Sequence, residues 1–271
     1  MNKKDVRFQR SCVVGRFCFI LAAVVVSGFA AAAARGEPVH HYEFEVNADD
    51  SVGGNHGTLM GDAQIVNDAQ RGNVLGLDGD GDYVEFSDYF VTTTEFTIAA
   101  WANHYGPGGG VDAENPILQQ RDDDSVVGYA ESSIILYTER SIGSPDPYAG
   151  VIVRTSGVGQ LLHDPMRDYG QWHHYAVTVD STNIVYYIDG LEVDTAANEQ
   201  TGNYVTDVDH ISIGKHSYRG ADRAFFYGTI DDVRIYDNAL APEAVAAIVP
   251  EPTTIGFFAL AGLMLVRKRC T

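Results

Sequence analysis

The sequence predicts an all-β domain in which two antiparallel sheets pack face to face. Short segments that alternate apolar and polar residues recur along the chain, as in residues 96–103 (FTIAAWAN) and 172–179 (WHHYAVTV). Glycine is abundant, with 28 residues, and turn-forming stretches separate the segments, whereas helical periodicity is almost absent. Strands at this spacing with so little helix are typical of an antiparallel β-sandwich.

The strands can be placed in order along the chain. The first covers residues 41–46, and a long loop rich in Asp and Asn follows at residues 47–57. Asp189-Gly190, between two alternating segments, predicts a tight hairpin. The sequence at 78–82, DGDGD, is predicted to be another hairpin turn, because Tyr83 stands where a calcium-binding helix–loop–helix needs Gly. Further strands are predicted at residues 74–77, 83–86, 96–103, 116–120, 133–138, 151–154, 172–179, 184–188, 191–194 and 210–214.

The stretch 227–240 (YGTIDDVRIYDNAL) is predicted to be the closing strand. Val233 and Ile235 share one face, but Ile230 is out of phase with them. An extra residue at Asp231–Asp232 would restore the phase, so a β-bulge is predicted there, a feature that often re-aims a side chain beside a functional site. A short helix with Pro in its first turn is predicted next, at residues 241–245.

The N-terminal residues 1–34 are predicted to be a secretory signal peptide. A basic start is followed by an apolar run over residues 17–34 that ends in small residues, with cleavage expected after Ala34. A retained membrane anchor is the alternative. The three cysteines, Cys12, Cys18 and Cys270, all lie in the terminal segments, so the domain between them has no disulfide.

The segment between the two termini is strongly acidic. From Arg35 to Glu251 there are 10 basic and 36 acidic residues, a net charge of −26. Such a surface repels nucleic acid and anionic lipid, which excludes partners of those two classes. It suits a solvated extracellular protein and divalent cations, although solubility alone also explains most of the acidity.

Five stretches in fixed order carry a resemblance to a known family. They are HYEFEVNADDSVGGNHGTL, GLDGDGDYVEF, FTIAAWANH, QWHHYAVTVDSTNIVYYIDGLEV and FYGTIDDVRIYDNALAPEAVAAI. In this order they resemble the laminin-G-like family of concanavalin A-like lectin/glucanase domains. The resemblance implies that residues 35–248 form one antiparallel jelly-roll β-sandwich with one concave sheet, and that the first and last strands meet at one edge.

The same resemblance implies a structural Ca²⁺ ion where the N-terminal loop meets the closing strand. The matching residues are Asp50 and Asp231, with Asp49, Asn55 and Asp232 as further ligands. Calcium takes six to eight oxygen ligands, which two such loops can supply. The alternative is that Asp50 caps a turn and that Asp231 and Asp232 are solvated charges at a strand end.

No catalytic site is predicted. Glucanases that share this sandwich place two Glu and an Asp at alternate positions of one strand. The nearest approximation is Glu192 and Asp194, but Ala197 occupies the place expected for the third carboxylate. His173 and His174 are adjacent in a strand and face opposite sides, so they cannot converge on one ion.

The C-terminal residues 249–271 carry a second resemblance. A Pro-Glu-Pro motif precedes an apolar run at residues 253–266 and a basic end. These parts resemble the PEP-CTERM sorting signal of Gram-negative bacteria, which implies cleavage by an exosortase-type transpeptidase. The apolar run, about 21 Å long as a helix, is short for a bilayer core of about 30 Å, so only transient membrane contact is expected. The motif residues are Pro250, Glu251, Pro252, Arg267, Lys268 and Arg269.

The sequence therefore predicts an exported, non-catalytic binding module. Its expected place is the cell surface or extracellular matrix of a Gram-negative-type bacterium, and its expected ligand is a glycan or a surface protein. Trp101, Tyr186 and Tyr187 are candidates for stacking on sugar, with core packing as the alternative for each. A glycoside hydrolase with a displaced catalytic pair and a purely structural surface protein are the other functions left open.

Overall fold

The computed structural model describes residues 36–112, 114–121, 132–140, 146–155, 158–200, 210–218 and 220–249. The predicted signal peptide and the predicted sorting signal from residue 250 onward lie outside these residues and stay predictions. Within the described ranges, no helix has the length and apolar character needed to span a bilayer.

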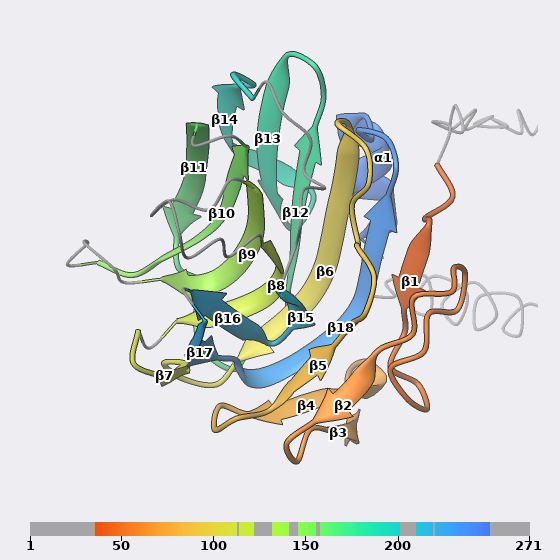
Figure 1. Cartoon of the computed structure of the whole chain (residues 1–271), viewed down its shortest axis with the longest axis vertical. Coiled ribbons are helices and arrows are strands. Elements are labelled where there is room, and N and C mark those ends of the chain that lie inside the picture. Colours follow the sequence, from red (N-terminus) through yellow and green to blue (C-terminus); the bar gives the residue numbers. More distant parts are fainter. Residues whose placement is uncertain are drawn as a thin grey trace, which may run out of the picture. The chain divides into compact units, whose positions relative to one another are not determined.

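The described residues fold into two large antiparallel sheets, as predicted (Figure 1). In the first, called sheet A, the order is β14-β13-β12-β6-β18-β4-β3, and β1 also pairs with β18. The short strand β1 thus joins the first residues of the domain to the closing strand, as the resemblance implied. The strands of sheet A are β1 (His40–Tyr42), β3 (Gln64–Asp68), β4 (Gly72–Asp78), β6 (Phe96–His104), β12 (His173–Val179), β13 (Asn183–Ile188), β14 (Leu191–Ala197) and β18 (Tyr227–Tyr236).

The second sheet, sheet B, has the order β11-β10-β9-β8-β15-β5-β2. A three-stranded minisheet, β16-β17-β7, is separate from both sheets. These strands are β2 (Thr58–Met60), β5 (Tyr83–Glu85), β7 (Gly109–Gly110), β8 (Asn115–Arg121), β9 (Ser132–Arg140), β10 (Tyr148–Thr155), β11 (Val158–Pro165), β15 (His210–Ile213), β16 (Lys215–Tyr218) and β17 (Ala221–Phe225).

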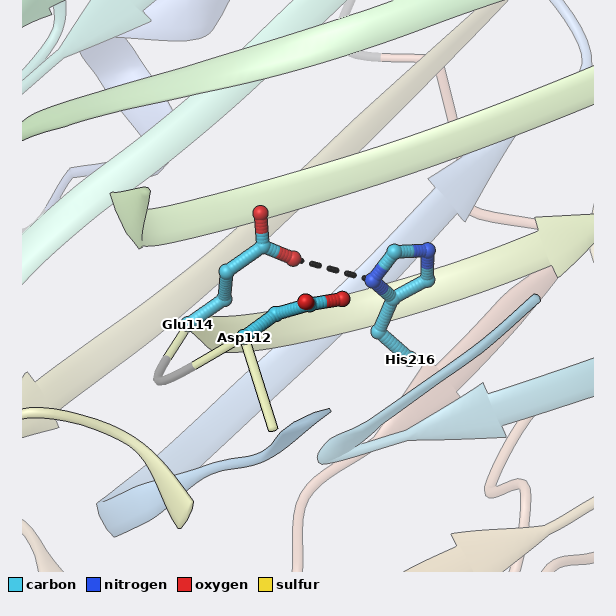
Figure 2. Close-up of side chains that lie close together, drawn as sticks. All are labelled: Asp112, Glu114 and His216. Carbon is cyan, nitrogen blue, oxygen red and sulfur yellow. Dashed lines mark hydrogen bonds and ion pairs between the residues drawn. The ribbon is translucent and has the colours of Figure 1, made fainter. Parts of the chain in front are cut away.

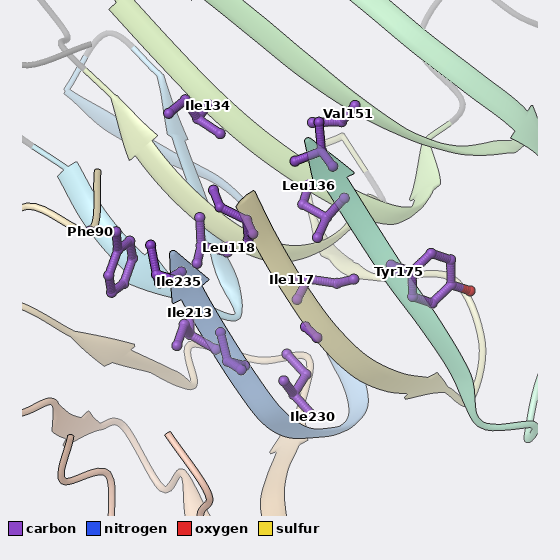
Figure 3. Close-up of a cluster of buried hydrophobic side chains, with 14 of the residues drawn as sticks. Phe90, Ile117, Leu118, Ile134, Leu136, Val151, Tyr175, Ile213, Ile230 and Ile235 are labelled. Atoms are coloured by element: carbon purple, nitrogen blue, oxygen red, sulfur yellow. The ribbon is translucent and has the colours of Figure 1, made fainter. Parts of the chain in front are cut away.

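The main core lies between sheets A and B (Figure 3). Leu118 and Leu136 of sheet B and Ile230 and Ile235 of sheet A are fully buried, since alternate residues of each strand face the partner sheet. The helix α1 (Pro242–Ile248) covers part of the outward face of sheet A, where Ala244, Val245 and Ile248 are buried. The helix packs on Ala99, Ala176, Tyr187 and Tyr236 and so covers only part of that face.

The minisheet lies on the outward face of sheet B. Gln119 of β8 alternates with the core residue Leu118 and so points away from the core. Its amide nevertheless is fully buried, because it donates to the Ser217 carbonyl (3.1 Å) and accepts from the Ser217 N–H (2.8 Å). This pairing fixes β16 over the centre of sheet B.

The predicted bulge in the closing strand is confirmed. The register between β18 and β6 shifts between Asp231 and Arg234, and Asp232 has a φ of 51°. Val233 and Ile235 are fully buried, as their alternation indicated. The predicted Asp189-Gly190 turn is confirmed as well, between the paired strands β13 and β14, with positive φ at both residues, as a type I′ hairpin loop requires.

Two local predictions were wrong. The first strand ends at Tyr42 rather than at residue 46, because Phe44 adopts a φ of 51°, which is left-handed rather than extended backbone. The DGDGD turn does not close a hairpin, because β4 belongs to sheet A and β5 to sheet B. The Asp82 carboxylate accepts the N–H groups of Asp62 (2.8 Å) and Asp78 (3.1 Å), which holds this crossing between the sheets.

Gly228 in β18 marks a close approach of two strands. Its φ is 148°, and a Cβ there would collide with the backbone oxygen of Asn103 in β6. We expect Gly228→Ala to lower the free energy of unfolding by at least about 2 kcal/mol, since both strain and overlap oppose the side chain. Urea denaturation measures the change. Gly54→Ala is the control, because a Cβ at Gly54 meets open space, and an equal loss in both variants would contradict the explanation.

Candidate functional site

The bulge separates the two neighbouring carboxylates of β18 and gives them different partners. Asp231 accepts a hydrogen bond from Arg71 Nε (2.6 Å). Asp232 lies 2.6 Å from His41 Nε2 and 2.9 Å from Arg234 Nε. Burial raises the pKa of Asp231 to about 6 against the opposing effect of Arg71, whereas the pKa of Asp232 is lowered because His41 and Arg234 outweigh burial. Both carboxylates are thus held in ion pairs.

Asp50 is the centre of the N-terminal loop. Its buried carboxylate contacts His40 Nδ1 at 2.6 Å and accepts the backbone N–H groups of His41 (3.0 Å), Val52 (3.1 Å) and Gly53 (2.9 Å). Burial alone would raise the pKa of Asp50, but the hydrogen bonds from His41 and His40 bring it below its ordinary value. The residue caps the loop, which is the alternative role left open by the sequence.

The predicted calcium ligands do not form one donor set. Asn55 donates to the Asp88 carbonyl (2.8 Å), and Asp49 is exposed beside His56. Among the described histidines, cysteines and carboxylates, two groups of three bring their ligand atoms within 4.8 Å of one another, and neither contains Asp50 or Asp231. Asp231 is paired with Arg71, and Asn55 Oδ1 is buried without a partner in the described structure, so the calcium ion at these residues stays a prediction.

The first of those two groups is Asp62, Asp78 and Asp82, at the crossing from β4 to β5. Asp82 is buried and the other two are exposed. Burial raises the pKa of Asp82 to about 6, and its contact with the Asp62 side chain acts in the same direction. The three carboxylates can offer oxygen ligands to a hard cation, as Ca²⁺ prefers.

The second group is Asp112, Glu114 and His216, under the minisheet (Figure 2). The fully buried Glu114 accepts from Arg140 Nε (2.8 Å) and contacts His216 Nδ1 of β16 (2.9 Å). Asp112 binds Arg223 of β17 through two bonds of 2.8 Å. Because each carboxylate already has an arginine, this group is an ion-pair network that attaches the minisheet to sheet B.

Aromatic side chains gather on the part of sheet A that α1 leaves open. Tyr105 follows β6, and its N–H donates to the carbonyl of Tyr227 in β18 (2.9 Å). The two rings lie 5.9 Å apart, edge to face, and they are 45% and 39% exposed. The next pair in the same outward row is Asn103 and Thr229, and the Thr229 hydroxyl lies 3.3 Å from the Tyr105 hydroxyl.

The row continues to Trp101, opposite Asp231. The Arg71 guanidinium lies over the Trp101 ring at 4.3 Å from its centroid and 5.4 Å from that of Trp172. The predicted ligand residue Trp101 is thus half-buried, and one of its neighbours is an arginine stacked on the ring. We call this surface the aromatic strip, made of Arg71, Trp101, Asn103, Tyr105, Trp172, Tyr227, Thr229 and Asp231.

Several polar atoms of the strip are buried without a hydrogen-bond partner in the described structure. They are the indole Nε1 atoms of Trp101 and Trp172 and Oδ1 of Asn103. Nδ1 of His174 is also buried without a partner. The His174 ring lies edge-on to the Trp101 ring, with 5.4 Å between their centroids. Buried polar groups normally find a partner, so two donors and an acceptor left unpaired within the strip indicate a place for a ligand or ordered water.

The other two predicted stacking residues are not on a surface. Tyr186 is fully buried in the main core, and Tyr187 is 2% exposed under α1. Their adjacent positions in β13 point to opposite faces, and both faces are covered. Neither ring is available to a ligand, and the core-packing alternative describes them.

Sequence reasoning missed Tyr105, Tyr227 and Arg71. The alternation that put Trp101 and Asn103 on one face extends by one step to Tyr105, so that residue carried a signal. Tyr227 and Arg71 carried none, because their place beside β6 depends on strand pairing over more than a hundred residues.

The structure is similar to known binding domains. Domain 4 of AbnA, a GH43 extracellular arabinanase from Geobacillus stearothermophilus solved with arabinotriose, has a TM-score of 0.59 and 20% identity, over 80% of this chain and 100% of that one. The receptor-binding domain of a botulinum neurotoxin C/D mosaic has a TM-score of 0.57 and 13% identity, over 78% of this chain and 50% of that one. The binding domain of Paraclostridial mosquitocidal protein 1 has a TM-score of 0.56 and 14% identity, over 78% of this chain and 51% of that one.

The chain thus spans about half the length of those two toxin domains. At such identities the likeness shows the fold, a jelly-roll sandwich, and nothing of the ligand. No curated protein matches the sequence. The model of the concanavalin A-like lectin/glucanases superfamily, Laminin_G_3, matches residues 78–246, more than half of the chain, and the protein belongs to this family.

Proposed function

We propose that the protein is a non-catalytic glycan-binding module and that the aromatic strip is its binding surface. The observation that carries the proposal is the pair Tyr105 and Tyr227, whose rings are side by side and open to solvent. Aromatic rings take the apolar face of a sugar, and neighbouring polar groups fix its hydroxyls. The oligosaccharide complex of the arabinanase domain, on the same fold, supports this ligand class.

The proposal includes export and processing. The leader at 1–34 and the Pro250-Glu251-Pro252 motif support secretion to the cell surface or matrix, with an exosortase-type enzyme cutting near the motif. Mass spectrometry of the C-terminus in protein from the native host tests this part. Peptides that run through Arg267 in the surface fraction would overturn it.

We expect the double substitution Tyr105→Ala and Tyr227→Ala to weaken glycan binding by about 30- to 100-fold. Each ring contributes about 1–1.5 kcal/mol, and 1.4 kcal/mol corresponds to a factor of ten in Kd. Because both side chains are well exposed, the free energy of unfolding should change little. A glycan array selects the ligand, and isothermal titration calorimetry on that ligand gives the two affinities.

Tyr148→Ala is the matched control. Tyr148 lies on sheet B, where its ring meets that of His163 at 4.9 Å, and its loss should leave the affinity unchanged. If binding is lost in this control and kept in the double variant, the binding site lies on sheet B. Release of reducing sugar from a bound polysaccharide would instead support a hydrolase. Absence of binding to every glycan on the array would support a structural protein.

A further inference from the structure

The positive charges at the aromatic strip are already paired within the protein. Arg71 lies 2.6 Å from Asp231 and 3.9 Å from Asp232, and its guanidinium is stacked on two indole rings. Arg234, the next cation along β18, lies 2.9 Å from Asp232. The side chains of both arginines are mostly buried, at 16% and 26% exposure. A carboxylate or sulfate on a ligand would have to displace one of these pairs.

The polar groups that remain at the strip are neutral. Asn103 Oδ1 is an acceptor without a partner, and the indole N–H groups of Trp101 and Trp172 are donors without one in the described structure. The hydroxyls of Tyr105 and Thr229 add groups that both donate and accept. A sugar hydroxyl can serve both kinds of atom, whereas a carboxylate only accepts and leaves Asn103 unsatisfied.

The surroundings also oppose an anionic ligand. Asp78 is directly opposite Tyr227 in the β4–β18 register and is exposed. The segment from Arg35 to Glu251 has a net charge of −26, so a polyanion approaches against a repulsive field. That repulsion weakens as salt shortens the screening length, to about 8 Å at physiological ionic strength.

From these charges and partners we infer that the strip selects uncharged polysaccharides over polymers that carry carboxylate or sulfate groups. The inference rests on the proposed glycan-binding function and names its ligand class. Binding then comes from ring stacking and neutral hydrogen bonds, neither of which depends strongly on ionic strength.

The test measures binding of the purified full-length protein to two sets of polymers by affinity electrophoresis and calorimetry. Dextran, pullulan, xylan and arabinan form the uncharged set, and dextran sulfate, alginate and polygalacturonate form the anionic set. We expect a ligand in the first set whose Kd changes less than twofold between 50 and 500 mM NaCl, and no ligand in the second set at 150 mM. Binding to the anionic set that weakens steeply with salt would overturn the inference and leave glycan binding intact. Absence of binding to every polymer would overturn both.

Asn103→Ala provides a second readout. Asn103 Oδ1 has no protein partner, but the side chain is only 6% exposed, so its removal should lower the melting temperature by a few degrees and weaken binding of the uncharged ligand by about tenfold. Asn67→Ala, an exposed position of β3, is the matched control and should change neither quantity. An unchanged affinity in Asn103→Ala would remove that residue from the ligand contacts and contradict the acceptor assignment.

Discussion

Asp50→Ala is expected to lower the free energy of unfolding by about 3–5 kcal/mol. The substitution leaves the His40 ring and the N–H groups of His41, Val52 and Gly53 without their acceptor. A buried group that loses its partner costs about 1–3 kcal/mol, and some of these groups will regain water. Asp50→Asn keeps the shape and one acceptor oxygen, so we expect roughly half of the loss. Urea denaturation at pH 7 measures both values.

The pH dependence of these variants follows from the same contacts. The pKa of Asp50 is lowered from its ordinary value of 3.8, so its ionised form stabilises the folded state. That contribution is complete well above pH 3.8, and it is lost as the pH falls through the lower pKa that Asp50 has in the folded state. The free energy of unfolding of the wild type should therefore decrease as the pH drops below about 4. In Asp50→Asn the part of this decrease that comes from Asp50 should be absent. A loss below 1 kcal/mol in Asp50→Ala, equal to that of the exposed control Asp49→Ala, would show that the loop does not depend on the carboxylate.

Glu114→Ala is the second large effect that we expect. The fully buried carboxylate neutralises Arg140 and contacts His216, and removing one partner of a buried pair costs about 3–5 kcal/mol because the other charge stays buried. The matched control is Asp164→Ala, which breaks the partly exposed pair with Arg167 and should cost less than about 1 kcal/mol.

Hydrogen exchange locates the Glu114 effect. Because Glu114 holds β16 through His216, the amides of β16 and β17 should exchange faster in Glu114→Ala, while those of β12 and β13 in sheet A keep their protection. The double variant Glu114→Met with Arg140→Met removes both charges and should recover part of the stability. Uniform exchange across both sheets would contradict an attachment role for the network.

The sequence predicted best where a pattern is local. The bulge at Asp231–Asp232 followed from a break in alternation, and the turn at Asp189-Gly190 followed from two residues that accept positive φ. Each signal lies within a few residues of the feature that it describes. The fold class could be predicted for the same reason, since strand alternation and turn spacing are local properties.

What could not be predicted depends on which strands become neighbours. Arg71 and Asp231 are 160 residues apart, and only the β4–β18 pairing makes them partners. Through that contact Asp231 forms an ion pair that no local sequence signal indicated. The burial of Tyr187 likewise depends on α1, an element some 60 residues further along the chain.

The last strand of the domain is also a central one. β18 lies between β6 on one side and β4 and β1 on the other, and its contact with β1 joins residues 193 positions apart. During synthesis, β4 and β6 therefore cannot pair with their common neighbour β18 until residues 227–236 have left the ribosome. Pairings of such long sequence separation close slowly, because loop entropy is lost before the contacts are gained. The domain completes its core only when nearly its whole length is available, and such a delay is compatible with the proposed export, in which the chain would cross a membrane unfolded.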